Sequence, residues 1–179
     1  MNRFITASLL LLSTPLFAAQ WIDKSGNAIK DQDNIKSSKN FIAQLILTSN
    51  EDDLLKKWQT PSETVNVNTS ETVERNKPIS AFIVFGGCKT DSKGNCNLVG
   101  KFKVYQPDGK VYANLNESEV WSGKPVPPNR QIELSVAYLK ITIENGEQLG
   151  KYTVESVVTD KNDNESVVLK NTFTAVEKK

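Results

Sequence analysis

Short segments with the residue pattern of β-strands run through most of this chain, and turn-forming residues separate them. Segments 101–105, 132–136 and 139–143 alternate between polar and apolar residues, which is typical of a strand with one exposed face. Segments 40–48 and 79–85 are apolar at nearly every position, which indicates strands buried on both faces. Further strands are predicted at 65–69, 110–112, 152–157 and 166–175.

This succession of short strands predicts the fold class. About seven to nine strands with turn signals between them, and no series of long helices, indicate an all-β protein built as an antiparallel β-sandwich. One short helix is predicted among the strands, because Leu54 and Trp58 recur at helical spacing behind Asn50, a good N-cap residue. We expect an extended N-terminal arm over 19–38 and a single sandwich domain over 39–179.

Residues 1–18 have the pattern of a secretory signal peptide. Arg3 precedes an apolar stretch that is too short to span a membrane, and the small residues Ala18 and Ala19 predict cleavage after one of them. No cysteine lies near the cut, so the lipid anchor of a bacterial lipoprotein is not expected. No later segment is apolar enough to span a membrane, and we therefore expect a periplasmic or secreted mature protein.

The charges of the expected mature chain balance. The full chain has 22 basic and 21 acidic residues, and Arg3 is the only charged residue lost with the signal peptide. Binding through nucleic-acid phosphates needs a basic excess or a dense basic patch. Because the remaining charges are equal in number and evenly mixed, we do not expect a nucleic-acid partner.

Cys88 and Cys96 are the only cysteines of the chain, and the expected export predicts that they form one disulfide. The residues between them are turn formers and follow an apolar run, so we expect the bridge to pin a hairpin loop. A redox-active pair and a metal site are the alternatives, and metal is disfavoured because the chain has no histidine. Lys89, Asp91 and Lys93 are predicted to form a contact surface, since a restrained loop loses little entropy on binding.

Two sequence patterns resemble those of known proteins. Segment 149–154 has a Gly-x-Tyr-x-Val pattern followed by a turn, and it resembles Ig-like modules of secreted bacterial proteins. This resemblance implies an Ig-like sandwich in which Tyr152 is a tyrosine corner, although Val154 stands where antibody domains have a cysteine. The pattern Phe-x-x-Phe-Gly-Gly-Cys at 82–88, with Gly-Asn-Cys and Pro-Asp-Gly after it, resembles small uncharacterised exported proteobacterial proteins. That second resemblance implies location and architecture, and no activity.

The absence of histidine from the chain excludes Ser-His-Asp and Cys-His catalysis, and it removes the usual zinc and copper ligand sets. The acidic pair at 52–53 stands in the first turn of the predicted helix, which disfavours a catalytic role for it. The polar series at 160–164 matches the first positions of a calcium loop, but Glu165 replaces the required glycine, so a plain turn is favoured. We expect no catalytic residue, no metal site and no cofactor.

A second candidate contact surface is predicted at 121–128, which combines an aromatic residue with a proline-rich stretch. Its residues are Trp121, Pro125, Pro127 and Pro128. The alternative is a long crossover between the sheets in which Trp121 plugs one end of the core. Trp58 has the same two interpretations, contact residue or core residue.

Together these patterns favour a non-catalytic binding module that engages a protein or an envelope component through the cysteine loop and segment 121–128. A hydrolase that uses carboxylates on glycans is the alternative, motivated by the 21 acidic residues. A periplasmic chaperone-like protein is a third hypothesis, although the chain is short for two domains.

Overall fold

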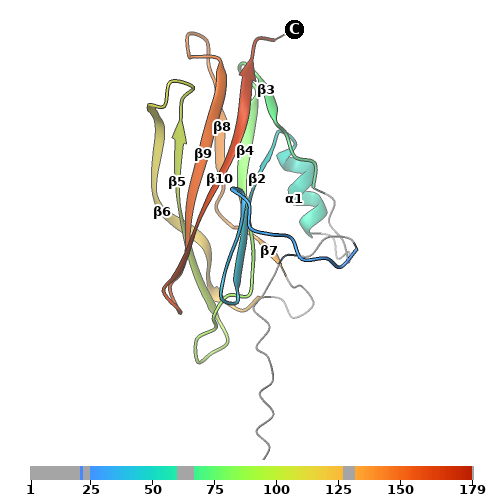
Figure 1. Cartoon of the computed structure of the whole chain (residues 1–179), viewed down its shortest axis with the longest axis vertical. Helices are drawn as coiled ribbons and strands as arrows, with labels where there is room; N and C mark the ends of the chain where they lie inside the picture. The colour runs from blue at the N-terminus through green and yellow to red at the C-terminus, as the bar shows by residue number, and fades with distance from the viewer. Residues whose placement is uncertain (1–20, 22–24, 60–66, 127–131, 179) are drawn as a thin grey trace, which may run out of the picture.

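Two five-stranded β-sheets pack face to face, and within the described residues one helix, α1 (Glu51–Gln59), lies outside them (Figure 1). The computed structural model describes residues 21, 25–59, 67–126 and 132–178. The predicted all-β sandwich with a short helix is confirmed. The predicted signal peptide lies outside the described residues. None of the described helical structure is long and apolar enough to span a membrane.

The first sheet consists of β1 (Ile35–Ser38), β2 (Phe41–Thr48), β4 (Pro78–Gly86), β7 (Glu133–Leu134) and β8 (Leu139–Thr142). Its spatial order is β1-β2-β4, and both β7 and β8 pair with β4 on the side away from β2. Nearly every residue of β2 and β4 is buried. The two apolar runs of the sequence therefore form the centre of this sheet, as expected.

The second sheet consists, in spatial order, of β3 (Thr72–Glu74), β10 (Glu165–Val176), β9 (Gly150–Asp160), β5 (Cys96–Tyr105) and β6 (Val111–Lys124). Neighbouring strands are antiparallel, except that β3 runs parallel to β10. Burial alternates along β5 and β9, in agreement with their alternating sequences. The residues that point out of this sheet are exposed or half-buried.

Tyr152 lies in the core between the sheets and has the role expected of a tyrosine corner. Its hydroxyl donates a hydrogen bond to the backbone carbonyl of Gln148, and its ring stacks on Phe173 with 5.3 Å between centroids. The ring of Tyr112 meets it edge-on at 5.6 Å. Burial and a hydrogen bond to Glu147 raise the pKa of Tyr112 to about 12, so this half-buried phenol at the border of the core stays neutral.

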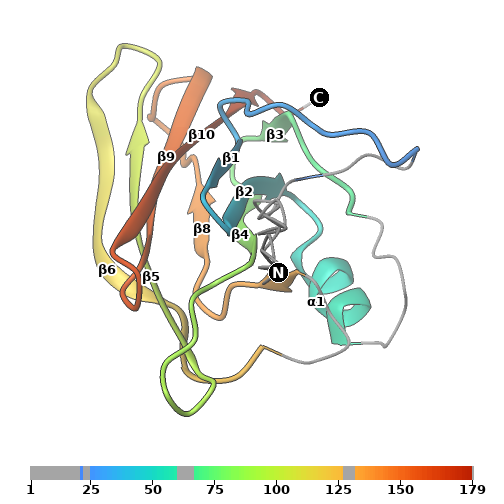
Figure 2. The same cartoon turned by 60° about the horizontal axis from the view of Figure 1, so that its bottom comes forward.

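Helix α1 covers the outer face of the first sheet (Figure 2). Leu54 and Trp58 point from the helix onto Phe82 and Val84 of β4. The indole N–H of Trp58 donates to the buried carboxylate of Glu133 at 3.1 Å. Trp58 is therefore a core residue, which decides between its two interpretations.

Glu51 fixes the start of the helix to the same sheet. Its carboxylate accepts hydrogen bonds from the hydroxyls of Ser80 (2.5 Å) and Tyr138 (2.7 Å) and pairs with the ammonium of Lys140 (2.9 Å). Burial alone would raise the pKa of Glu51, but the bonds from Ser80, Lys140 and Tyr138 hold it below its ordinary value. The ring of Tyr138 also stacks on Phe82 at 4.4 Å, so one cluster joins helix and sheet.

The edges of the sheets differ from the sequence-based expectation. Strand β1 takes residues 35–38 from the predicted arm, and β6 continues to Lys124, far beyond the predicted segment 110–112. Residues 67–69 form no strand, although 65–69 was predicted as one. An edge strand has few buried positions, so β1 and β6 lack the apolar alternation on which the prediction depended.

Two residues of the predicted arm bridge the sheets. The carbonyl of Asn34 accepts a hydrogen bond from the N–H of Leu45 on β2 at 2.9 Å. The neighbouring carbonyl of Asp33 accepts one from the N–H of Lys170 on β10 at 2.7 Å. This part of the arm is therefore integrated into the sandwich.

Candidate functional site

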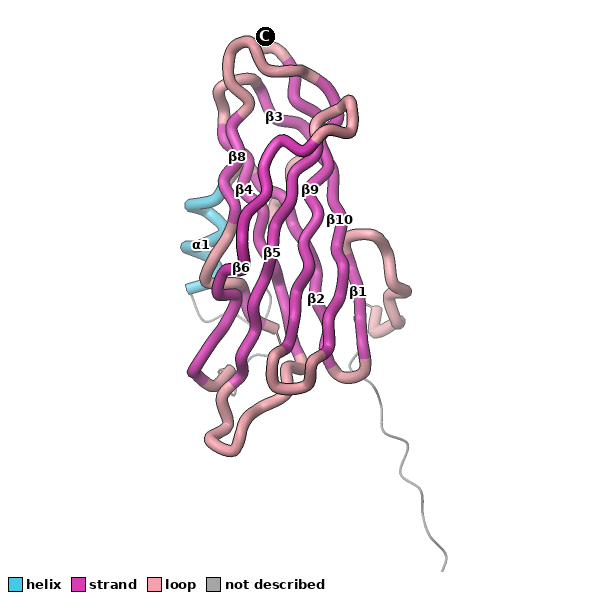
Figure 3. The backbone as a smooth tube through the Cα atoms, turned by 90° about the vertical axis from the view of Figure 1, so that its left-hand side faces the viewer, coloured by secondary structure: helices cyan, strands magenta, loops and turns pink. Residues whose placement is uncertain are grey.

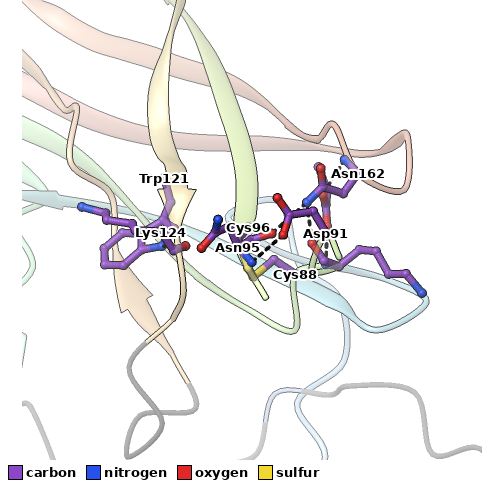
Figure 4. Close-up of a disulfide and its surroundings, with 9 residues drawn as sticks. Cys88, Asp91, Asn95, Cys96, Trp121, Lys124 and Asn162 are labelled. Atoms are coloured by element: carbon purple, nitrogen blue, oxygen red, sulfur yellow. Dashed lines mark hydrogen bonds between the residues drawn. A yellow bond between two sulfur atoms is a disulfide. The ribbon is translucent and has the colours of Figure 1, made fainter. Parts of the chain in front are cut away.

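Three loops and the end of β6 meet at one end of the sandwich. The loops are the β1–β2 turn at 39–40, the β4–β5 loop at 87–95 and the β9–β10 turn at 161–164. Lys124 at the end of β6 is the register partner of Cys96 on β5. The two contact surfaces that were predicted separately are therefore neighbours, as Figure 4 shows. We call these loops, together with residues 121–126, the disulfide end.

Cys88 and Cys96 form the predicted disulfide, with 6.0 Å between their Cα atoms. The predicted hairpin is wrong, because β4 belongs to the first sheet and β5 to the second. The bridged loop is an arch between the sheets. Turn-forming residues occur in hairpins and in arches alike, so the loop sequence does not distinguish them. The disulfide thus constrains the connection from one sheet to the other.

Asp91 folds the bridged loop back on itself. Its carboxylate accepts hydrogen bonds from the backbone N–H groups of Lys93 (2.8 Å) and Asn95 (2.9 Å). The bonds from Asn95 and Lys93 hold the pKa of Asp91 below its ordinary value. Lys89 and Lys93 are exposed, as predicted for contact residues. Asp91 is exposed as well, but its carboxylate already stabilises the loop.

Hydrogen bonds join the β9–β10 turn to the bridged loop. The buried carboxylate of Asp160 accepts from the backbone N–H groups of Lys89 (2.6 Å) and Asn162 (3.0 Å). The side-chain amide of Asn162 donates to the carbonyls of Lys89 (2.9 Å) and Asn95 (3.1 Å). The sequence predicted a turn here, with a calcium loop as the alternative, and gave no indication that this stretch anchors the bridged loop. Local sequence cannot indicate this contact, because Asp160 and Lys89 are 71 positions apart in the chain.

Trp121 stands at the border between core and surface. Its half-buried ring lies 5.7 Å from the ring of Phe85, and its indole N–H donates to the carbonyl of Lys124 at 3.1 Å. The ammonium of Lys124 lies 3.9 Å from the centre of the indole. Trp121 thus closes one end of the core, but from within strand β6 and not from a crossover loop. Pro125, close to it in the chain, is exposed. Pro127 and Pro128 lie outside the described residues.

A hollow of about 210 Å³ opens between the three loops. Its lining residues are Lys39, Asn40, Phe41, Gly87, Cys88, Lys89, Thr90, Asp160 and Asp163. Lys39 pairs with Glu165 and lies 4.0 Å from Asp163. The hydrogen bond to Glu165 raises the pKa of Lys39, so this ammonium stays charged. The hollow combines these paired charges with the apolar side chain of Phe41 and the disulfide sulfur of Cys88.

The carboxylates around the hollow have structural partners. Both oxygens of Asp160 accept backbone N–H groups, and Asp163 faces Lys39. In the part of the chain that the structure describes, no group of three or more His, Cys, Asp or Glu side chains is placed to hold a metal ion. The side chains that this end presents to solvent include Lys89, Lys93 and the half-buried indole of Trp121.

No protein-family model matches this sequence, and no curated protein matches it. Similar solved structures include a family 123 glycoside hydrolase from Clostridium perfringens, with a TM-score of 0.42 and 14% identity over 76% of this chain and 27% of that one. A Niemann-Pick type C2 protein from Japanese carpenter ant has a TM-score of 0.40 and 9% identity over 74% of this chain and 89% of that one. This chain therefore spans about a quarter of the glycoside hydrolase. Similarities at this level carry no functional argument.

Proposed function

We propose that this protein is a non-catalytic binding module, exported to the periplasm or out of the cell, that engages a protein or an envelope component through the disulfide end. The observation that carries the proposal is that the bridged loop and the segment with Trp121 are neighbours, because Lys124 near the end of that segment pairs with Cys96 at the end of the loop. Its disulfide fits an oxidising compartment, where such bonds persist.

The fixed shape of this surface supports a role in recognition. The disulfide, the Asp160 carboxylate and the Asn162 amide hold the bridged loop at several points. A loop that is already ordered loses less conformational entropy when a partner binds. Tryptophan is also among the residues that contribute most to binding interfaces. Trp121 is therefore the residue that we expect to anchor a partner.

The carboxylates of the disulfide end favour binding over hydrolysis. An acid and base pair needs carboxyl groups that are free to exchange protons with a substrate. The carboxylate of Asp160 accepts hydrogen bonds from two backbone N–H groups, and that of Asp91 accepts two more. Their positions support loop structure, which is why we prefer the binding hypothesis to the glycan hydrolase.

The proposal is tested by affinity capture from envelope extract with the mature protein as bait. Lys89→Glu/Lys93→Glu reverses two exposed charges of the bridged loop without touching the core. Lys77→Glu/Lys178→Glu is the matched control, since it makes the same change at exposed positions just before β4 and just after β10, away from the bridged loop that follows β4. We expect a partner, identified by mass spectrometry, to be retained by wild type and control and lost by the loop variant.

Capture of the same proteins by all three baits would contradict the proposal. So would the release of products from a polysaccharide by the purified protein, because that result would indicate the hydrolase. Circular dichroism of each variant confirms that the charge reversals leave the fold intact.

A further inference from the structure

Within the residues that the structure describes, the outer face of the second sheet is bare. Figure 3 shows it toward the viewer, with no other described segment lying over the middle of β5, β9 and β10. The outward residues of these strands follow the register, so that Lys103, Glu155 and Lys170 form one row across the sheet. Lys101, Val157 and Val168 form the next row.

Basic residues outnumber acidic ones at the outward positions of β5, β9 and β10, whereas the edge strand β6 carries Glu117 and Glu119. The charged residues at the outward positions of β5, β9 and β10 are Lys101, Lys103, Lys151, Lys170 and Glu155. Glu155 pairs with Lys170 at 3.1 Å. Among the described residues, no carboxylate lies within ion-pair distance of the other three lysines. An evenly charged chain thus gathers these lysines into a basic patch on one face of the sheet.

A shallow hollow of about 120 Å³ lies within the patch. It is lined by Lys101, Phe102, Lys103, Asn114, Glu155 and Val157. Lys101 and Lys103 point to the same side of β5, roughly 6.5 Å apart along the strand. Asn114 is the register partner of Lys103 on the neighbouring strand β6. Two ammonium groups, an amide and a carboxylate therefore surround one depression.

We propose that this face binds an acidic polysaccharide. Lys101 and Lys103 attract the carboxylate or sulfate groups of such a chain by charge complementarity. The Asn114 amide and the Glu155 carboxylate supply donors and acceptors for sugar hydroxyls. The Glu155 carboxylate among the lining residues accepts hydrogen bonds from the hydroxyls of a polysaccharide, whereas a ligand that presents only phosphates offers it no donor. The flat rows of the sheet leave room for a polymer to extend to Lys170 and Lys151.

This surface lies on the sheet face and is distinct from the disulfide end, so the inference does not depend on the proposed function.

The probe is an oligogalacturonate, and its affinity for the mature protein is measured by titration calorimetry with a neutral dextran oligosaccharide as the negative ligand. Lys101→Gln/Lys103→Gln removes the two charges of the hollow. Lys77→Gln/Lys178→Gln is the matched control, because these two exposed lysines belong to neither proposed surface.

We expect oligogalacturonate to bind and dextran not to bind. The hollow variant should bind about 10-fold more weakly, as expected from the loss of two exposed ion pairs, and the control should bind like wild type. Asn114→Ala keeps every charge and should still weaken binding about threefold through a lost hydrogen bond.

Several results would overturn the inference. They are a lack of oligogalacturonate binding, an equal loss in both lysine variants, or an unchanged affinity in Asn114→Ala. Tighter binding to phosphatidylglycerol vesicles or to single-stranded DNA would also overturn it, in favour of a membrane surface or a nucleic acid.

Discussion

The outer faces of the two sheets differ in what lies on them. Helix α1 covers the first sheet, and the residues of β2 and β4 are buried on both sides (Figure 2). The second sheet has no such cover among the described residues, and burial alternates along β9 from one residue to the next. Both sheets share one core, so the difference arises entirely on the outside.

This difference shows how the apolar pattern of a strand reports on its surroundings. Ile46, Phe82 and Val84 point away from the central core and need the helix to remove them from water. The corresponding positions of the second sheet hold lysine, threonine and valine, which tolerate solvent. Within the described residues the bare face is therefore open to solvent, whereas helix α1 closes the covered face.

Truncation on the covered face should have the largest effect on stability. Phe82→Ala removes a fully buried ring between helix and sheet and should lower the free energy of unfolding by about 3–5 kcal/mol. Val168→Ala on the bare face is the control and should change it by less than about 0.5 kcal/mol, because Val168 is 47% exposed. Urea unfolding measures both. Losses of similar size would mean that the two faces are equally covered.

Removal of the disulfide should have the next largest effect. Cys88→Ala/Cys96→Ala opens a short loop, and the chain-entropy model gives a loss of about 2–3 kcal/mol. Hydrogen exchange should speed up in the loop at 87–95 while β2 and β4 stay protected. Faster exchange throughout β4 instead would show that the bridge supports the covered face and not only the loop.

The Glu51 cluster should make the covered face sensitive to acid. The folded-state pKa of Glu51 lies below its ordinary value, so its stabilisation is present above the unfolded-state pKa and is lost as pH falls through the folded-state pKa. Glu51→Gln should cost about 1–2 kcal/mol at pH 7 and less at about pH 3. Urea unfolding at the two pH values measures this. An equal loss of unfolding free energy at both pH values would argue against the ion pair as the cause. Glu119→Gln on the exposed edge strand β6 is the control.

The smallest effect is expected for the ion pair of the bare face. Lys170→Gln breaks the ion pair with Glu155. Because the Lys170 side chain is 53% exposed, this substitution should change the free energy of unfolding by at most about 0.5 kcal/mol. The pair of Lys140 with Glu51 has nearly the same exposure, but Glu51 also accepts hydrogen bonds from Ser80 and Tyr138 in the cluster that joins helix and sheet, so Lys140→Gln should cost more. Thermal unfolding of the two variants compares them directly. A greater loss in Lys170→Gln would reverse the expected order of the faces.

Much of the fold was predictable because buried strands and amphipathic elements leave a strong pattern. The apolar runs at 40–48 and 79–85 predicted β2 and β4, and the spacing of Leu54 and Trp58 predicted helix α1. Strand β1 and most of β6 were missed, since an edge strand with polar residues has no periodic signal.

The candidate site was predictable only in pieces. The disulfide followed from the cysteine count, but its arch geometry depends on which sheet each flanking strand joins. The meeting of Trp121 with the cysteine loop depends on the pairing of β5 with β6, whose register shifts at several points. The bonds from Asp160 and Asn162 are likewise products of the topology, not of local sequence.

Carbene footprinting of the mature protein, read by peptide mass spectrometry, tests most directly whether one outer face is closed and the other open. We expect strong labelling at Lys101 of β5 and at Val168 and Lys170 of β10, and protection of Phe82 and Val84 of β4. Equal labelling of β4 and β10, or protection of the outward residues of β10, would contradict the account.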